Sequence, residues 1–452
     1  MKKIAPLAAA LAVLIGMGWA AQRWSESRPG RAEWALDPGL LDSGASLGIL
    51  LLGAWFLGRM FAAAGIPQLV GYLVFGIIAG PSSPLEVVTR GELGYLALVN
   101  DLAIAMIALA AGGEMHLAFL RKSGRAVIAI AGCQIALVLA AVTVGFALAL
   151  PRLGWTPGLS TTQVVLVALV IGTVSIASSP AVLLAVLSEL NAKGPMSRLS
   201  LAITVCKDLG LVLLFTIVLS IASASIASDA AEAPSGMSVA IATGVHLIGS
   251  IVVGAIAGLI TGIFIARSGT PRPVVLILAC IGLAALSERL HLELLLVAVA
   301  AGMVLANGWP KRTEHLFDTV VWLSTPVYCV FFAVAGAKLD LSAVASMWPV
   351  ALGLAAIRGA SVWVGTRIGL AVSRPEGDWT PWLWTAFVPQ AGVTLALALL
   401  VEQTFPTQDF GAKIFTLLVA AVAIHELVGP ILLKLGLVRA GEAGANRRTN
   451  SE

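Results

Sequence analysis

The sequence predicts an all-α polytopic membrane protein with thirteen transmembrane helices, and three observations support this fold class. Hydrophobic residues make up 59% of the 452 residues, charged residues only 12%, and the mean hydropathy is +0.96, values that soluble domains do not reach. Apolar runs of about 17 to 25 residues, which span about 30 Å of hydrocarbon as helix, recur along the chain. The third observation is that proline and polar residues interrupt two of these runs.

Hydropathy and helix-breaking residues place the spans in chain order. They are expected at 44–62, 67–80, 93–111, 126–150, 162–187, 199–225, 239–266, 273–287, 292–307, 319–336, 346–371, 381–402 and 411–435. Lys and Arg gather in the loops on the same side as the C-terminus, so the positive-inside rule predicts a cytoplasmic tail over 436–452. The net charge of +4 reflects this loop bias and does not indicate a nucleic-acid partner.

The residues before the first span fit two interpretations. Lys2 and Lys3 precede an apolar run from Ile4 to Ala20, as in a cleaved signal peptide or in a fourteenth helix. The signal peptide is slightly favoured. Region 1–43 is therefore expected to hold a signal peptide or extra helix followed by an outside segment.

Two similar stretches indicate an internal repeat. A-G-G-E-M-H-L at 111–117 and A-G-A-K-L-D-L at 335–341 each close an apolar helix. Seven spans separate these helices, an odd number, so the two halves have opposite orientations, as in secondary transporters with inverted repeats. The expected domains are a first repeat over 44–225, a linker helix over 239–266 and a second repeat over 273–435. Chance similarity between Gly- and Ala-rich helices is the alternative.

The spans at 162–187 and 381–402 occupy equivalent places in the two repeats, and both have broken interiors. The candidate ion ligands at these breaks are Thr173, Ser178, Ser179 and Gln390, beside Pro180 and Pro389. A proline frees a backbone carbonyl one turn earlier, and hydroxyl or amide groups add further oxygens. Because unwound backbone inside a membrane lines a cavity, we expect two crossed, discontinuous helices that bind an ion. Simple proline kinks are the alternative.

Two adjacent charges, Lys207 and Asp208, interrupt the span at 199–225. A charge at bilayer depth costs from about 2.5 to more than 10 kcal/mol, so it is expected to lie in a polar pathway. Arg358 lies about twelve residues into its own span, too deep for its side chain to reach either interface comfortably. His425 and Glu426, in the last span, fit either a polar contact or helix packing, and packing is the commoner use.

These residues give the chain a resemblance to bacterial monovalent cation:proton antiporters, in particular the second antiporter family with its Kef-type and Nap-type members. The matching motifs are GIPQLVGYLVFGIIAGP at 65–81, ASSPAVLLAVL at 177–187, the Asp208 helix, and FFAVAGAKLDL at 331–341. The resemblance implies thirteen helices, a homodimer in the bacterial inner membrane, and an elevator-like movement of a core domain that contains the crossed helices.

The resemblance also assigns roles to individual residues. The transport aspartate falls on Asp208 and the hydroxyl-rich break on Ser178 and Ser179. The basic residue of the family falls on Arg358, where neutralising the dipole end of a broken helix or pairing with a carboxylate is expected. Glu114 falls on a position where packing or capping is expected.

Lys207 departs from the family, whose members commonly carry Asp, Asn or Gln before the transport aspartate. Lys207 and Arg358 are two cations at the depth of a single carboxylate, Asp208, unless the fold brings Glu114 or Asp101 inward. A like charge at about 4 Å costs roughly 4 kcal/mol at an effective dielectric near 20. Three interpretations are open. In the first, Lys207 is neutral when the cation binds and carries a second proton. In the second, it is a tethered cation in place of a substrate acid. In the third, it faces a carbonyl or Glu114 and is structural; the second and third together are favoured.

The expected function is exchange of Na⁺ or K⁺, with Li⁺ as a further candidate, for H⁺ by alternating access, Asp208 binding cation and proton competitively. The alternatives are a Na⁺- or H⁺-coupled symporter of a small organic anion, with Lys207 and Arg358 as a carboxylate clamp, or a K⁺ efflux carrier. An enzyme is not expected, because the sequence has neither H-E-x-x-H nor G-x-S-x-G. We expect no cofactor and no metal beyond the transported cation. The expected partners are the cation, the proton, the lipid bilayer and a second copy of the chain.

Overall fold

The computed structural model describes residues 38–84, 86–115, 117–226, 236–267, 272–290, 292–375, 377–405 and 408–444. These residues form helices and connecting turns, with no strand among them. The predicted signal peptide or extra helix lies outside the described residues, as does the end of the predicted tail.

The helices follow one another as the apolar runs predict. They are α2 (Pro38–Ala63), α3 (Gln68–Ala79), α4 (Arg90–Tyr95), α5 (Ala97–Gly113), α6 (Leu117–Arg152), α7 (Thr161–Val174), α8 (Pro180–Glu189), α9 (Pro195–Ile226), α10 (Gly236–Arg267), α11 (Arg272–Leu290), α12 (Leu294–Gly308), α13 (Pro310–Ala337), α14 (Leu341–Ser373), the 3-10 helix η1 (Thr380–Phe387), α15 (Gly392–Thr404) and α16 (Asp409–Arg439).

Seven of the described helices are long and apolar enough to cross a membrane, or eight if the bent pair η1 and α15 forms one span. Other apolar helices have only 10–17 residues. A ten-residue helix such as α8 rises only about 15 Å, half the thickness of the hydrocarbon core. The protein is therefore an all-helical, multi-pass membrane protein, and the exact count of thirteen spans stays a prediction.

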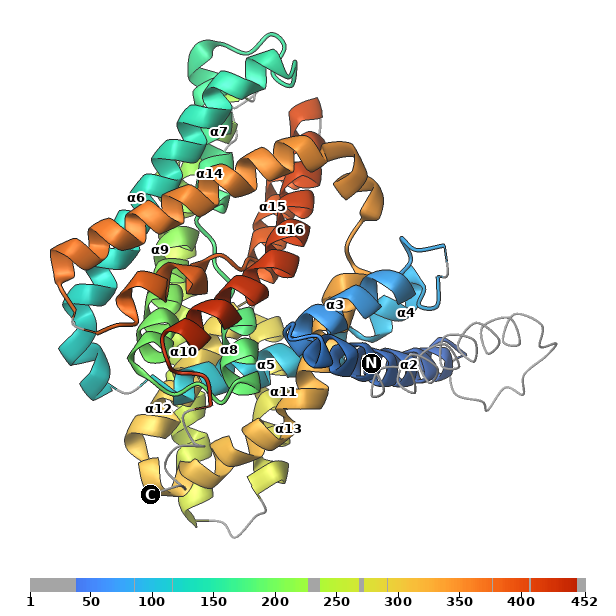
Figure 1. Cartoon of the computed structure of the whole chain (residues 1–452), viewed down its shortest axis with the longest axis vertical. Coiled ribbons are helices and arrows are strands. Elements are labelled where there is room, and N and C mark those ends of the chain that lie inside the picture. Colours follow the sequence, from blue (N-terminus) through green and yellow to red (C-terminus); the bar gives the residue numbers. More distant parts are fainter. Residues whose placement is uncertain are drawn as a thin grey trace.

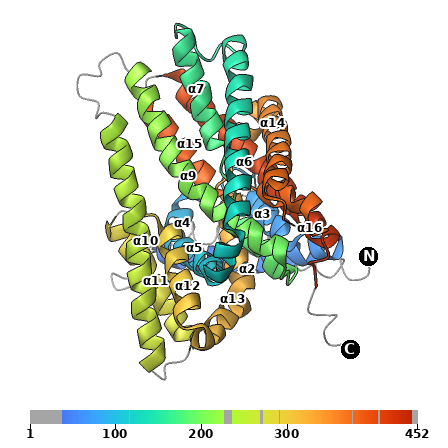
Figure 2. The same cartoon turned by 90° about the vertical axis from the view of Figure 1, so that its left-hand side faces the viewer.

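The helices pack in two groups that Figures 1 and 2 show from two sides. In the first group α14 packs against α6 and α16, α7 and α9 pack against α6, and η1 and α15 pack against α16. In the second group α3 packs against α2 and α13, and α5 against α12 and α13. The long helix α10 contacts both groups, through α9 and α12. Further contacts between the groups run through α8 and between α3 and α16.

Two helix crossings in the second group are closed by reciprocal glycines. Where α3 crosses α13, a Cβ on Gly76 would lie 2.0 Å from the carbonyl oxygen of Ala333, and one on Gly336 would lie 2.1 Å from that of Leu73. Only glycine permits this approach, because any side chain would overlap the facing backbone.

The crossing of α5 with α12 repeats the same arrangement. A Cβ on Gly112 would lie 2.0 Å from the carbonyl oxygen of Val299, and one on Gly302 would lie 2.1 Å from that of Leu109. In both crossings each glycine faces the residue three positions before the partner glycine. The two crossings therefore share one register.

The segment after α16 folds back onto the start of α9. The Glu442 carboxylate accepts hydrogen bonds from the N–H groups of Met196 (2.7 Å) and Ser197 (2.9 Å), and the Gly444 N–H donates to the Leu190 carbonyl (3.0 Å). The predicted tail over 436–452 thus begins inside α16 and continues as a docked segment up to residue 444. This docking cannot be predicted from hydropathy, because hydrogen bonds and not apolar side chains hold the segment in place.

Candidate ion-binding site

Both interrupted spans are broken in the structure, and the two breaks are in contact. The first break separates α7 from α8, and the second separates η1 from α15 with a bend of 44°. The Ser179 N–H donates to the Pro389 carbonyl at 3.0 Å, and Ser178 Oγ donates to the Phe387 carbonyl at 3.2 Å. The breaks therefore form one polar crossing inside the first helix group.

Arg358 reaches this crossing from α14 and is completely buried. Its Nε donates to the Ser175 carbonyl (2.8 Å) and its Nη1 to the Val388 carbonyl (2.8 Å). Its Nη2 donates to the carbonyls of Ala177 (2.7 Å) and Phe387 (2.9 Å). Breaking a helix leaves such carbonyls without intrahelical partners, and the carbonyl ends of α7 and η1 carry partial negative charge. The contacts fit the expected role of neutralising the dipole ends of broken helices.

Lys207 points into the same crossing from α9. Its Nζ donates to Ser178 Oγ (2.7 Å) and to Gln134 Oε1 (3.0 Å), and lies 5.3 Å from the centre of the Phe387 ring. Gln134 is a buried residue of α6 that donates onward to Thr366 Oγ1 on α14 at 2.8 Å. Gln134 is not among the site residues predicted from the sequence. A glutamine inside an apolar span was the feature that could have identified it.

Asp208 differs from its neighbour because its carboxylate has no bonding partner. The side chain is 5% exposed, and neither oxygen makes a hydrogen bond with any residue that the structure describes. The Ser178 N–H lies close to the carboxylate without reaching hydrogen-bond geometry, and the nearby charged groups are Lys207 and Glu293, the latter at the start of α12. A buried carboxylate without a partner needs a proton or a cation.

The other predicted ligands divide into two sets. Gln390 lies at the crossing, where its Nε2 donates to the Ala177 carbonyl at 3.3 Å. The hydroxyls of Thr173 and Ser179 are already used, since Thr173 donates to the Leu169 carbonyl (2.7 Å) and Ser179 accepts from the first turn of α8 (3.2 Å).

Neither acid that the sequence offered as a counter-charge enters the crossing. Glu114 occupies the C-cap of α5 and is exposed, and Asp101 is half-buried near the start of that helix. The hydrogen bonds of Lys207 go to the Ser178 hydroxyl and the Gln134 amide oxygen. They do not go to Glu114 or to a backbone carbonyl, the partners considered from the sequence.

The second buried acid near the crossing is Glu426 on α16. Its side chain is 2% exposed, and its Oε2 has no hydrogen-bond partner among the described residues. The adjacent His425 contacts the Ala421 carbonyl at 2.8 Å and lies near Arg358. The last helix therefore contributes a buried carboxyl oxygen without a partner, which neither the polar contact nor the helix packing considered from the sequence predicts.

This fold and site define a class of protein: a multi-pass membrane protein with two broken helices that meet at a buried, charged crossing, as in secondary transporters. Residues 47–438 match the family model described as sodium/hydrogen exchanger, transmembrane, and the chain belongs to this family. The protein is accordingly a transporter and not an enzyme.

Two solved structures of the sodium proton antiporter MjNhaP1 from Methanocaldococcus jannaschii have a similar fold. The structure at pH 8 has a TM-score of 0.65 and 17% identity, covering 90% of this chain and 100% of that one. The electron-microscopy structure has a TM-score of 0.66 and 18% identity, covering 88% of this chain and 98% of that one. The sequence has no match among the curated proteins.

Proposed function

We propose that the protein exchanges a monovalent cation for H⁺ by alternating access and that Asp208 binds the two in turn. The observation that carries this proposal is the buried Asp208 carboxylate, whose two oxygens lack hydrogen-bond partners beside the crossing of the broken helices. Family membership makes Na⁺ the first candidate, with K⁺ and Li⁺ as further candidates.

The mechanism follows from competition at one carboxylate. Ionised Asp208 binds the cation, with Ser178 and Gln390 at the crossing as the candidate further ligands, and protonation of Asp208 releases it. When the cation-loaded and proton-loaded states cross the membrane but the empty ionised state does not, each ion moves only in exchange for the other. The proton gradient then supplies the energy.

Lys207 acts in this proposal as a tethered cation that organises the crossing. Its hydrogen bonds to Ser178 and Gln134 fix the ammonium group between α6, α9 and the first break. Its charge opposes a bound cation at Asp208, which weakens cation binding and favours release. Arg358 has the structural role, since it holds the carbonyls of both breaks.

The proposal includes two inverted repeats over 44–225 and 273–435, linked by the helix over 239–266. The matching registers of the two glycine crossings support it, because exchange of the repeats would convert the α3–α13 crossing into the α12–α5 crossing. The resemblance extends the proposal to an elevator-like movement of the first helix group, in a homodimer of the bacterial inner membrane with a cytoplasmic C-terminus.

The contacts of Arg358 argue against the organic-anion symporter. A carboxylate clamp needs free donors on the guanidinium, and four of its five N–H groups already donate to backbone carbonyls. The exchanger therefore explains the site better than the symporter.

The test is dequenching of a pH dye in inside-out vesicles as Na⁺, K⁺ or Li⁺ is added. The wild type should dequench with at least one cation, and D208N should not. D101N is the matched control, because Asp101 is a half-buried aspartate outside the crossing, and it should behave as the wild type. Exchange by D208N at the wild-type rate would overturn the proposal. Na⁺-driven uptake of a labelled organic anion without dequenching would favour the symporter.

A further inference from the structure

Glu426 is a buried carboxyl group that the exchange at Asp208 does not use. It is almost fully buried, and its Oε2 lacks a hydrogen-bond partner among the described residues. An ionised carboxylate in such a place is costly unless it is paired, so intramembrane acids of this kind commonly carry protons.

The packing of α16 shows what Glu426 faces. Gly429 lies against the second break, since a Cβ there would be 2.8 Å from the Pro389 Cα. Ala423 packs in one cluster with Leu395 of α15. Because residues three apart share one face of a helix, Glu426 lies between these two contacts. It therefore faces the first turn of α15, which begins directly after the second break.

The first turn of α15 has unsatisfied polar groups of its own. The buried Thr394 Oγ1 has no hydrogen-bond partner among the described residues, and the N-cap residue Ala391 offers no side-chain bond to the helix. The N-terminal end of a helix carries partial positive charge, which favours an ionised carboxylate and disfavours a metal cation. Glu426 thus has an apolar surrounding that suits its acid form and a helix end that suits its anion, which is the setting of a proton-binding group.

Among the residues that the structure describes, no charged group around α16 forms an ion pair with Glu426. Of the elements packed against α16, α3 and η1 carry no charged residue. Helix α14 brings Arg358, which lies near His425 and donates to backbone carbonyls. Helix α15 carries Glu402 near its far end, and Glu189 of α8 lies near Lys434. Glu426 is therefore free to exchange a proton.

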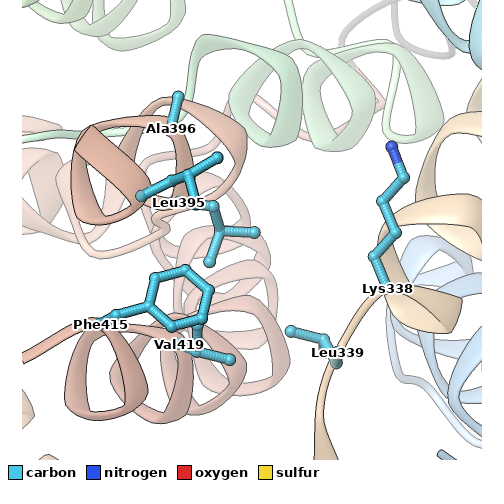
Figure 3. Close-up of a pocket in the computed structure, with 7 residues that line it drawn as sticks. Lys338, Leu339, Leu395, Ala396, Phe415 and Val419 are labelled. Carbon is cyan, nitrogen blue, oxygen red and sulfur yellow. The ribbon is translucent and has the colours of Figure 1, made fainter. Parts of the chain in front are cut away.

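A hollow of about 250 Å³ lies near the end where α16 begins (Figure 3). It is lined by Lys338 and Leu339 after α13, by Leu395, Ala396 and Leu399 of α15, and by Phe415 and Val419 of α16. Val419 and Glu426 share one face of α16, seven residues or about 10 Å apart. The hollow therefore brings empty space to within about two helical turns of Glu426, on the same face of α16.

We propose that Glu426 is a second proton-binding group of the exchanger, an inference that rests on the proposed exchange at Asp208. In the proton-loaded state Asp208 and Glu426 each hold one proton on a carboxylate oxygen. In the other state both protons have left, one cation binds Asp208, and Glu426 is ionised. The two states differ by one positive charge, so exchange of two protons for one cation is electrogenic.

The experiment uses purified full-length protein in proteoliposomes with equal pH on both sides and a clamped membrane potential. For the wild type, a tenfold cation gradient should be balanced by about 59 mV, the value for one net charge. E426Q should still exchange, but without any dependence on potential. E402Q, which changes a half-buried glutamate of α15, should keep the wild-type balance.

Several results would overturn the inference. A wild type that ignores the potential, or E426Q with the wild-type balance, would exclude a proton on Glu426. If E426Q does not fold, E426D should remain electrogenic with a shifted pH profile, and an unchanged profile would also overturn it. Infrared difference spectra on acidification should show a carboxylic-acid band that E426Q lacks. Absence of any wild-type exchange would instead contradict the function proposed at Asp208.

Discussion

The ammonium group of Lys207 donates a 2.7 Å hydrogen bond to the hydroxyl of Ser178, which joins the helix that carries Asp208 to the first break. Lys207 thus stands beside a carboxylate that has no hydrogen-bond partner among the described residues, and in the proposed exchange it is a fixed cation. Replacing it should strengthen cation binding.

The first prediction is that K207N exchanges with a KM for Na⁺ at least about tenfold below that of the wild type, since tenfold is only ~1.4 kcal/mol and a like charge at about 4 Å costs more than that. Initial rates of dequenching against Na⁺ concentration measure it. Asparagine keeps the position polar and removes the charge. Complete loss of exchange in folded K207N would indicate instead that Lys207 itself carries a proton.

The second prediction concerns Arg358. R358K should unfold at a clearly lower temperature than the wild type, because lysine has three donors and no planar fork for four carbonyls. Each lost bond to a charged group is worth about 1.5–3 kcal/mol. Thermal unfolding in detergent, followed by tryptophan fluorescence, tests this. R367K, at an exposed position of the same helix, should melt as the wild type does. Equal melting of R358K and wild type would refute a structural role.

The third prediction concerns the docked segment after α16. Gly194 at the start of α9 has no side chain for capping, and Glu442 accepts the N–H groups of Met196 and Ser197 in its place. E442A should cost about 0.5–2 kcal/mol, as does loss of an N-cap. Hydrogen–deuterium exchange in the first turn of α9 should become faster, while E86A, at an exposed loop position, should leave it unchanged. Unchanged protection in E442A would mean that the segment does not cap α9.

The fourth prediction tests movement between the two helix groups. The Gln68 N–H at the start of α3 donates a bifurcated hydrogen bond to both carboxylate oxygens of Glu189, at the end of α8, at 2.9 and 3.0 Å. Because α8 continues the first broken helix, an elevator-like movement of the crossed helices has to separate these residues. In a cysteine-free background, cysteines at both positions joined by a short bifunctional maleimide should stop exchange, while the unjoined pair continues. Full exchange in fully joined protein would exclude the movement.

Local signals allowed much of the site to be predicted. The breaks follow from proline beside serine or glutamine in apolar runs, and Asp208 follows from the cost of a membrane charge. The partners of Lys207 could not be predicted in this way, because Gln134 lies 73 residues away in sequence. The burial of Glu426 was also missed, since hydropathy along α16 does not reveal which face meets the second break.

The positions of the helices could be predicted from the sequence, but their full lengths could not. Hydropathy reports only the apolar part of a helix, so α6 was expected over 126–150, yet it begins at Leu117 and includes the basic residues Arg121 and Arg125. Likewise α13 begins at Pro310, where a proline suits the first turn, nine positions before the predicted start at 319. Helix ends that extend into polar surroundings leave no trace in hydropathy.

The four glycines of the α3–α13 and α5–α12 crossings also determine where the molecule is stiff. Backbone lies directly on backbone there, with no side chain between that changes rotamer to take up strain. The second helix group is in this sense a rigid frame, so deformation concentrates in the seams around α8, between α3 and α16, and between α9 and α10. In the proposed elevator-like movement, this frame is the fixed surface against which the ion site travels.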